Sequence, residues 1–390
     1  MNNGRPLRIL HLIGESDAGG LSRYLYDLCA AMHAQGHQVT VAGQRGLQHH
    51  LFQNAPWEWI DVPLKGGPFD LMRAAMILRR HLRKNPVDLL HTHYRRPTIV
   101  ARYLQNVCGG RLPLLFTLHL SHMRMRGGFL GFSDFGDAIH CAASDARQWL
   151  IDDVNIPPDR IFVIPHGIDI NRYPLGSEEL RRKARAELSL GMRDRVALFV
   201  GRLSIPKNEH WLFDLADVTR KSMPDLRILL AGTGPHENLL RRRLEDDNLE
   251  DRVFLLGERN PVPLYHAADA LLLPSYKEGF ALVCAEAMAT GLPVLRTRTS
   301  GTSETIIEGV TGRSVPIDRP TFVKAAIEFL ADLPALRRMG QAAAQHVRQN
   351  LTFDRQVRDM ISLYRRLIEG AAAPAKAGET SGISGELANT

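Results

Sequence analysis

Short apolar runs alternate with helix-like segments along this chain of 390 residues. Residues 7–13 have the composition of a buried strand, residues 21–32 carry apolar side chains at helical spacing, and residues 39–42 form the next apolar run. A strand, a crossover helix and a second strand make one βαβ unit, whose two strands lie parallel in one sheet. The pattern therefore predicts an α/β fold built on parallel sheets.

Length and composition indicate how many domains to expect and of what kind. A chain of 390 residues exceeds the size at which one hydrophobic core stops growing, so two domains are expected. No apolar run approaches the roughly 20 residues of a membrane-spanning helix. The cysteines Cys29, Cys108, Cys141 and Cys284 have no metal-ligand spacing. These features predict a cytoplasmic protein with reduced thiols.

Positive charge is concentrated in one part of the chain. Residues 65–126 contain twelve Lys or Arg against two Asp, a local +10, whereas the whole chain carries +7. Within residues 120–132, Arg124 and Arg126 stand among methionines, aromatics and glycines, which is typical of a mobile loop. Four interpretations are open: a solvated helix face, an anionic membrane surface, a phosphate-bearing acceptor, or nucleic acid. Nucleic acid is the weakest, because no recognised nucleic-acid-binding motif is present.

The stretch from Glu278 to Glu286 has the pattern of a strand-to-helix connection. An apolar run at residues 270–273 precedes it, and helix formers up to Gly291 follow it. Glu286 lies eight positions after Glu278, at most about 12 Å away along a helix axis. The free amides between them, which favour an anion, belong to Gly279, Phe280, Ala281 and Leu282. Two carboxylates around such amides suit an elongated polar ligand, although they could also merely offset the helix dipole or face water.

Charged and polar residues also follow other predicted strands. Arg202 and Lys207, five positions apart after the run 196–200, could clamp a diphosphate. The histidines at further strand ends, where an open parallel sheet binds its ligands, are His91, His93 and His119. The alternative to ligand binding is that these histidines are structural residues held by hydrogen bonds. A metal site is not expected, because no acidic residue accompanies them.

Glycines and polar stretches mark the helix entry and the linkers. Gly19-Gly20 at the start of the first helix lets a backbone approach a phosphate or sugar closely, although a tight turn alone also explains such a pair. The dinucleotide fingerprint Gly-x-Gly-x-x-Gly is absent. Residues 171–194 are polar and charged and are predicted to be a linker. Residues 352–368 are predicted to form a last helix, with a disordered tail after it.

Several motifs together resemble the family 4 retaining glycosyltransferases. They are Gly19-Gly20 with residues 36–41, residues 201–203 with Lys207, residues 231–235, and residues 278–294. The resemblance covers roughly residues 7–368. It implies the B-type glycosyltransferase fold, in which two doubly wound Rossmann-like domains face each other across a cleft. The implied domains are an acceptor-side domain at 1–175, a nucleotide-sugar-binding domain at 176–350, a final helix at 351–369 that packs back on the first domain, and a disordered tail at 370–390.

The resemblance also implies a role for each site residue. Glu286 is expected to bind the ribose hydroxyls and Glu278 the hydroxyls of the donor sugar, while Arg202 and Lys207 bind the diphosphate. The residues expected to close on the donor from the other side are Gly19, Gly20 and His119. The chain has no Asp-x-Asp motif, so no metal or other cofactor is expected, and the two cations take the place of a divalent ion.

Two positions depart from the family pattern. Asn208 stands where a glycine usually follows the lysine, and Thr302-Ser303 stand where glycine or isoleucine and proline often precede the glutamate. The first departure concerns the flexibility of the loop. The second concerns the sugar and base pockets, so the sugar and the base of the donor stay open.

We interpret the sequence as a cytoplasmic retaining glycosyltransferase. It is expected to move a hexose or a hexose derivative from a nucleoside diphosphate sugar to a glycan or lipid-linked acceptor in the synthesis of a surface polysaccharide or glycolipid. Peripheral attachment to the inner face of an anionic membrane is open, with Arg124 and Arg126 on that side. The alternatives are a nucleotide-sugar 2-epimerase and a non-catalytic nucleotide-sugar-binding subunit. A nicotinamide dehydrogenase would need the glycine fingerprint that the chain lacks.

Overall fold

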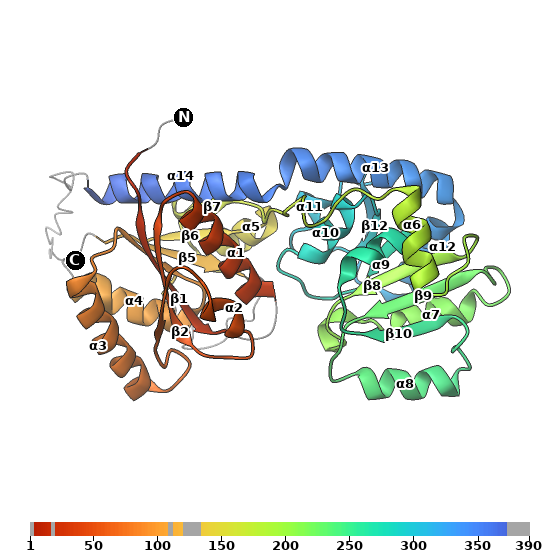
Figure 1. The fold of residues 1–390 in the computed structure, drawn as a ribbon, viewed down its shortest axis with the longest axis horizontal. Helices are drawn as coiled ribbons and strands as arrows, with labels where there is room; N and C mark the ends of the chain where they lie inside the picture. The colour runs from red at the N-terminus through yellow and green to blue at the C-terminus, as the bar shows by residue number, and fades with distance from the viewer. Residues whose placement is uncertain (1–3, 17–19, 108–111, 120–133, 373–390) are drawn as a thin grey trace, which may run out of the picture.

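The computed structural model describes residues 4–16, 20–107, 112–119 and 134–372. Two α/β halves lie side by side, and the helices α13 (Leu333–Asn350) and α14 (Phe353–Ala372) run along one side of both (Figure 1). Within the described residues, no helix is long and apolar enough to cross a membrane.

The N-terminal half is built on a sheet of seven parallel strands in the order β3-β2-β1-β4-β5-β6-β7. Its strands are β1 (Arg8–Glu15), β2 (Gln38–Gln44), β3 (Glu58–Asp61), β4 (Leu89–Thr92), β5 (Leu114–Leu118), β6 (Ala138–Cys141) and β7 (Ile161–Val163). Its helices are α1 (Gly20–Ala34), α2 (His50–Gln53), α3 (Pro68–Lys84), α4 (Arg95–Val107) and α5 (Ser144–Asp152). The strand order turns back between β1 and β4, so ligands are expected beyond the carboxyl ends of these strands.

The C-terminal half repeats this plan with six parallel strands in the order β10-β9-β8-β11-β12-β13. Its strands are β8 (Arg195–Val200), β9 (Leu226–Ala231), β10 (Val253–Gly257), β11 (Ala270–Leu273), β12 (Val294–Thr297) and β13 (Gly312–Val315). Its helices, besides α13, are α6 (Glu178–Glu187), α7 (Trp211–Val218), α8 (Glu237–Asp246), α9 (Pro261–Ala267), α10 (Leu282–Ala289), α11 (Thr302–Thr305) and α12 (Arg319–Ala331). The predicted pair of doubly wound α/β domains is confirmed.

Helix α14 leaves the C-terminal half and packs on the N-terminal core. Val357, Met360 and Leu363 are buried in the same cluster as Ile9 of β1. The Tyr364 hydroxyl, fully buried, lies 2.8 Å from Nδ1 of His91, a residue 273 positions earlier. The last helix therefore ties the end of the chain to the strand ends of the first sheet.

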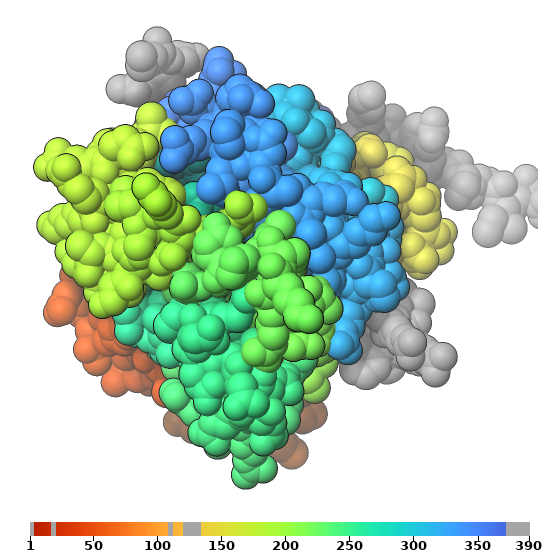
Figure 2. Space-filling view, turned by 90° about the vertical axis from the view of Figure 1, so that its right-hand side faces the viewer, coloured from red at the N-terminus to blue at the C-terminus, as the bar shows by residue number. Residues whose placement is uncertain are grey.

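Residues 171–194, predicted to be a linker, contain the helix α6, which packs against α9. Ser177 caps this helix by accepting a hydrogen bond from the amide of Leu180 (3.2 Å). The Arg185 guanidinium is fully buried and lies 3.0 Å from the Asp269 carboxylate. The linker prediction was therefore wrong for residues 178–187. Their charged sequence indicated exposure to solvent, but one of the charges, on Arg185, is buried in an ion pair. In Figure 2 the segment around α6, yellow-green, covers part of the C-terminal half.

Two further elements differ in extent from expectation. The helical periodicity over residues 322–348 belongs to two helices, because the Asp332 carboxylate accepts a hydrogen bond from the amide of Ala335 (2.9 Å) and starts α13 anew. Helix α14 continues through Ala372, three residues into the predicted tail at 370–390. The rest of that tail lies outside the described residues.

Candidate active site

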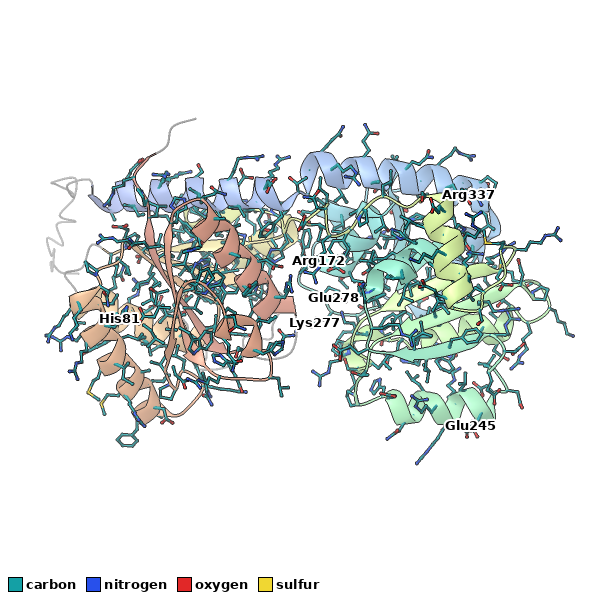
Figure 3. All side chains as sticks on the ribbon, viewed as in Figure 1. His81, Arg172, Glu245, Lys277, Glu278 and Arg337 are labelled. Atoms are coloured by element: carbon teal, nitrogen blue, oxygen red, sulfur yellow. The ribbon has the colours of Figure 1, made fainter. Side chains whose placement is uncertain are left out.

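The loop between β11 and α10 is one of the places where the two halves meet. Gly279 touches the N-terminal half so closely that a Cβ atom there would collide with the carbonyl oxygen of His119. The Phe280 ring stands edge-on to the ring of His166, with centroids 5.3 Å apart. Figure 3 shows Lys277, Glu278 and Arg172 gathered at this junction. The stretch that the sequence singled out therefore lies between the two sheets.

The backbone of this loop is held in an uncommon conformation. Ala281 has φ +55°, in the left-handed region that residues with a side chain rarely adopt. It precedes α10, and its carbonyl accepts a hydrogen bond from the amide of Cys284 (2.9 Å). Such strain concentrates at functional sites, where the surrounding structure imposes it. Helix α10 starts at Leu282, and the first turn of a helix leaves backbone amides without intrahelical partners, a setting that favours an anion.

Lys207 and Glu278 form an ion pair in this site. The ammonium nitrogen lies 2.6 Å from a carboxylate oxygen, and only 10% of the Glu278 side chain is exposed. Lys207 ends a short 3-10 turn that is fastened to the loop, because the amide of Tyr276 donates to the carbonyl of Pro206 (3.0 Å). The structure thus brings together two of the residues that the sequence proposed for different parts of a donor.

The residue after Lys207 explains one departure from the family pattern. Asn208 has φ +50°, a left-handed conformation that glycine and asparagine tolerate best. Its side-chain amide donates to the carbonyl of Pro274 (3.0 Å). Asparagine therefore keeps the backbone turn that a glycine would allow and adds a hydrogen bond that holds it.

Arg202 is exposed at the carboxyl end of β8. Among the described residues, it makes no hydrogen bond or ion pair. The adjacent Gly201 packs tightly at the tip of the sheet, where a Cβ on Gly232 would collide with the Gly201 carbonyl oxygen. Arg202 therefore extends an exposed side chain from a closely packed strand end, which suits a cation that closes on a ligand.

Glu286 lies in a different surrounding from Glu278. The Tyr265 hydroxyl donates to its carboxylate (2.9 Å), and burial raises the pKa of Glu286. Glu286 lines a cavity of about 430 Å³ together with Arg172 and Tyr173, whereas Glu278 lines another of about 580 Å³. The two carboxylates of one short stretch thus open onto two cavities at the junction of the halves.

Six histidines with lowered pKa gather at the carboxyl edge of the N-terminal sheet: His11, His91, His93, His119, His140 and His166. Burial lowers the pKa of His11 and of His119 to about 3, and that of His140 to about 4. Burial and the neighbouring histidines hold the pKa of His91 well below its usual range. These imidazoles are therefore neutral at physiological pH.

Three of these histidines form a hydrogen-bonded row that we call the histidine chain. Nδ1 of His11 lies 3.2 Å from Nε2 of His93, and Nδ1 of His93 lies 3.1 Å from Nε2 of His119. A neutral imidazole has one N–H and one lone pair, so the three tautomers must agree in direction. Nε2 of His11 is buried without a partner among the described residues. Because a buried N–H without an acceptor is rare, we expect the chain to run outward, so that His119 carries its proton on Nδ1.

The same edge contains a group that could hold a metal ion, formed by His11, His91 and His93. Among the described residues, five of its six ring nitrogens already have hydrogen-bond partners, and Nε2 of His11 is the exception. Nε2 of His91 lies 2.6 Å from the Thr117 hydroxyl, and both ring nitrogens of His93 face the histidine chain. The donor set thus fits a neutral hydrogen-bond network better than a metal, because Nε2 of His11 is its one ring nitrogen without a partner among the described residues.

A third cavity, which we call the N-terminal cavity, has a volume of about 530 Å³. Its polar lining includes His119, Tyr94, Lys65, Arg95 and Arg96. Lys65 is paired with the carboxylate of Glu15, also in the lining. His119 lines this cavity, and its carbonyl oxygen lies against Gly279 of the β11–α10 loop.

The sequence interpretation omitted part of the site. His11, His140 and His166 were not proposed, although His11 is a polar residue inside an otherwise apolar strand and carried a signal. Tyr265, whose hydroxyl donates a hydrogen bond to Glu286, had no recognisable signal in the sequence, because it lies on the separate helix α9. Gly20 opens α1 as expected. Gly19, Arg124 and Arg126 lie outside the described residues.

Comparison with known proteins shows the family to which the chain belongs. Residues 18–172 match the family described as Glycosyltransferase Family 4, and residues 181–346 match Glycosyl transferases group 1. A D-inositol 3-phosphate glycosyltransferase of Nocardia farcinica is 30% identical over 380 residues, which cover 85% of this chain and 82% of the relative. One from Corynebacterium glutamicum (strain R) is 27% identical over 375 residues, covering 86% and 89%.

A solved structure shares the fold. The crystal structure of Anabaena Alr3699/HepE in complex with UDP aligns with a TM-score of 0.81 at 20% identity, covering 92% of this chain and 100% of that one. The B-type glycosyltransferase fold, expected from the sequence, is confirmed. The fold, the two matched segments and the relatives together show that the chain is a glycosyltransferase and belongs to glycosyltransferase family 4.

Proposed function

We propose that this enzyme moves a hexose or hexose derivative from a nucleoside diphosphate sugar to a glycan or lipid-linked acceptor. The observation that carries the proposal is the Lys207–Glu278 pair, 2.6 Å apart beside the helix amides at the start of α10. A cation and amides next to a carboxylate can bind a diphosphate and an adjoining sugar hydroxyl together. No metal is needed in this scheme, because Lys207 and Arg202 neutralise the leaving diphosphate.

The donor would span the junction between the halves. Glu278 would accept hydrogen bonds from the sugar hydroxyls, and the amides from Gly279 to Leu282 would face phosphate oxygens. Glu286, held by the Tyr265 hydroxyl, would accept from the ribose hydroxyls. Binding of UDP by Anabaena Alr3699/HepE supports a nucleotide donor, although the base preferred by this chain is left open by the proposal.

The transfer would retain the anomeric configuration. The acceptor hydroxyl oxygen bonds to the anomeric carbon on the face that the diphosphate leaves. The bond from that carbon to the β-phosphate oxygen breaks, and this oxygen takes the acceptor's proton. With its proton on Nδ1, His119 would donate a hydrogen bond to the sugar and would not act as a base.

The acceptor would enter through the N-terminal cavity. Arg95 and Arg96 in its lining suit an anionic group on the acceptor, such as a phosphate. A second candidate acceptor is a phosphorylated polyol, because the Nocardia farcinica relative is described as acting on D-inositol 3-phosphate. We place the reaction in the cytoplasm, at the inner face of the membrane when the acceptor is lipid-linked. No nucleic acid takes part in this proposal.

A panel of donors and acceptors tests the proposal. The purified enzyme is incubated with UDP- and GDP-linked hexoses and with either a polyprenyl-diphosphate-linked sugar or D-inositol 3-phosphate. We expect nucleoside diphosphate release in step with glycosylated acceptor. Lys207→Ala should lose this turnover, and Arg242→Ala, at an exposed arginine of α8, is the matched control. Isomerised nucleotide sugar without acceptor would indicate an epimerase, and binding without turnover would indicate a binding subunit.

A further inference from the structure

Helix α3 turns apolar side chains toward solvent. Phe69 is 82% exposed, Met72 55% and Met76 56%, although the opposite side of the helix already fills the core with Ala74 and Leu78. The outward side of a surface helix is normally polar. A phenylalanine and two methionines spaced three and four residues apart form one stripe. This stripe needs a partner that offers an apolar environment.

The same helix is strongly basic. Its cations are Arg73, Arg79, Arg80, Arg83 and Lys84, against the single carboxylate of Asp70. The neighbouring helix α4, which packs on α3, exposes Ile99 by 45% and Tyr103 by 43%. In Figure 1, α3 forms the outer end of the N-terminal half, away from the C-terminal half. Cations beside exposed apolar side chains are typical of a surface that meets anionic lipid.

The stripe lies next to the N-terminal cavity along the chain. Leu64 and Lys65 line that cavity, and only Gly66 and Gly67 separate them from Pro68, the first residue of α3. Helix α4 also starts at the cavity, with Arg95 and Arg96 in the lining. The first turns of both helices are therefore anchored at its edge, where a lipid-linked acceptor would leave the bilayer.

We infer that α3, with the exposed side of α4, docks on an anionic bilayer and presents the N-terminal cavity to a lipid-linked acceptor. The inference rests on the proposed lipid-linked acceptor for its purpose, but docking can be measured without any acceptor. Phe69 and Met72 insert among the acyl chains near the headgroups, while Arg80, Arg83 and Lys84 face the lipid phosphates. An acidic protein partner would match the cations but would leave the apolar stripe without a hydrocarbon environment.

Flotation with vesicles tests the inference. The whole enzyme is mixed with phosphatidylglycerol–phosphatidylcholine vesicles or with phosphatidylcholine alone, at 0.1 M and 1 M salt. Raising the salt shortens the Debye length from about 10 Å to about 3 Å. We expect flotation with the anionic vesicles at 0.1 M salt and little at 1 M. Absence of flotation at 0.1 M, or equal flotation with phosphatidylcholine alone, would overturn the inference.

Matched variants locate the contact. Arg80→Glu with Arg83→Glu should lower the partition coefficient by roughly thirtyfold or more, since each basic residue near the surface contributes about fivefold. Phe69→Asp with Met72→Asp should lower it by about tenfold or more. The control changes Leu239→Asp and Arg242→Glu on α8, whose Leu239 is 61% exposed and whose cations are balanced by carboxylates. Equal loss in the control would overturn the assignment to α3.

A water-borne acceptor separates this inference from the proposed function. The α3 variants should turn over the donor with such an acceptor at the wild-type rate, because none of the changed residues touches the donor site. Loss of flotation with full turnover is the expected outcome. If the wild type turns over donor normally and does not float, docking fails while the proposed function stands. If it floats and shows no transfer, the proposed function fails alone.

Discussion

The six histidines at the carboxyl edge of the N-terminal sheet predict a steep loss of stability in mild acid. His11, His91, His93, His119, His140 and His166 all have a lowered pKa in the folded protein. In the unfolded chain each would titrate near pH 6.5. Unfolding therefore takes up protons below pH 6.5, and stability is fully present above that pH and falls as the pH drops toward the folded values.

The size of the effect follows from the number of groups. Lowering the pH from 7.5 to 5.5 costs about 1.4 kcal/mol for each histidine that stays neutral when folded, or roughly 8 kcal/mol for the set as an upper bound. That is comparable to the whole stability of a typical domain. At pH 5.5 the unfolding of the N-terminal half should take up about five protons from this set.

Calorimetry measures both quantities. Scans from pH 7.5 to 5.5 should show the first transition moving to much lower temperature, and unfolding heats in buffers of different ionisation enthalpy give the proton uptake. His11→Asn, whose amide can replace the Nδ1–H of His11, should lower the uptake by about one proton. The exposed His50 supplies the control, and His50→Gln should change nothing. An uptake below about two protons, or a transition that does not move, would refute this reasoning.

The remaining predictions concern the site. Arg202→Ala should lower the rate of transfer by about a hundredfold or more. The free energy of unfolding should stay within about 0.5 kcal/mol of the wild type, because the side chain is exposed. A normal rate would show that Arg202 does not bind the diphosphate. Lys207→Ala should lower the rate of transfer by the same factor. It should also lower the free energy of unfolding by about 1–3 kcal/mol, since it leaves the Glu278 carboxylate, 10% exposed, without its ion-pair partner. Thermal unfolding measures the loss of stability separately from the loss of rate. Tyr364→Phe should destabilise the N-terminal half by about 1 kcal/mol through the lost contact with His91, seen as a lower Tm without a change in KM for the donor. Turnover should persist in excess chelator, and a strict need for Mg²⁺ or Mn²⁺ would contradict the role given to the two cations.

The sequence predicted the sheets well because their strands are apolar runs. Parallel strands covered on both sides have little choice of residue, so β4, β5 and β11 stand out in the sequence. Helix α6 did not, because its buried Arg185 is satisfied by Asp269, 84 positions away. A charge that is paired over such a distance has the same sequence signal as a solvated one.

The sequence indicated which candidate site residues lie close along the chain, but not which distant residues the fold brings together. Glu278 and Glu286 belong to one strand-to-helix connection, which periodicity reveals. The grouping of the six histidines depends on strand register, which sets His11 of β1 beside His91 of β4, and Thr117 of β5 beside His140 of β6. Nothing in a single strand fixes its neighbour's register, so histidines 80 or 82 positions apart, such as His11 with His91 and with His93, could not be joined from the sequence.

The anomeric configuration of the product tests the central claim most directly. The enzyme is given an α-linked nucleoside diphosphate hexose and an acceptor that it uses, and the new linkage is assigned by proton NMR. Front-face attack, with the leaving phosphate taking the acceptor's proton and His119 donating to the sugar, predicts an α-linked product. A β-linked product would require a base on the opposite face of the sugar and would contradict the mechanism proposed for Arg202, Lys207 and Glu278.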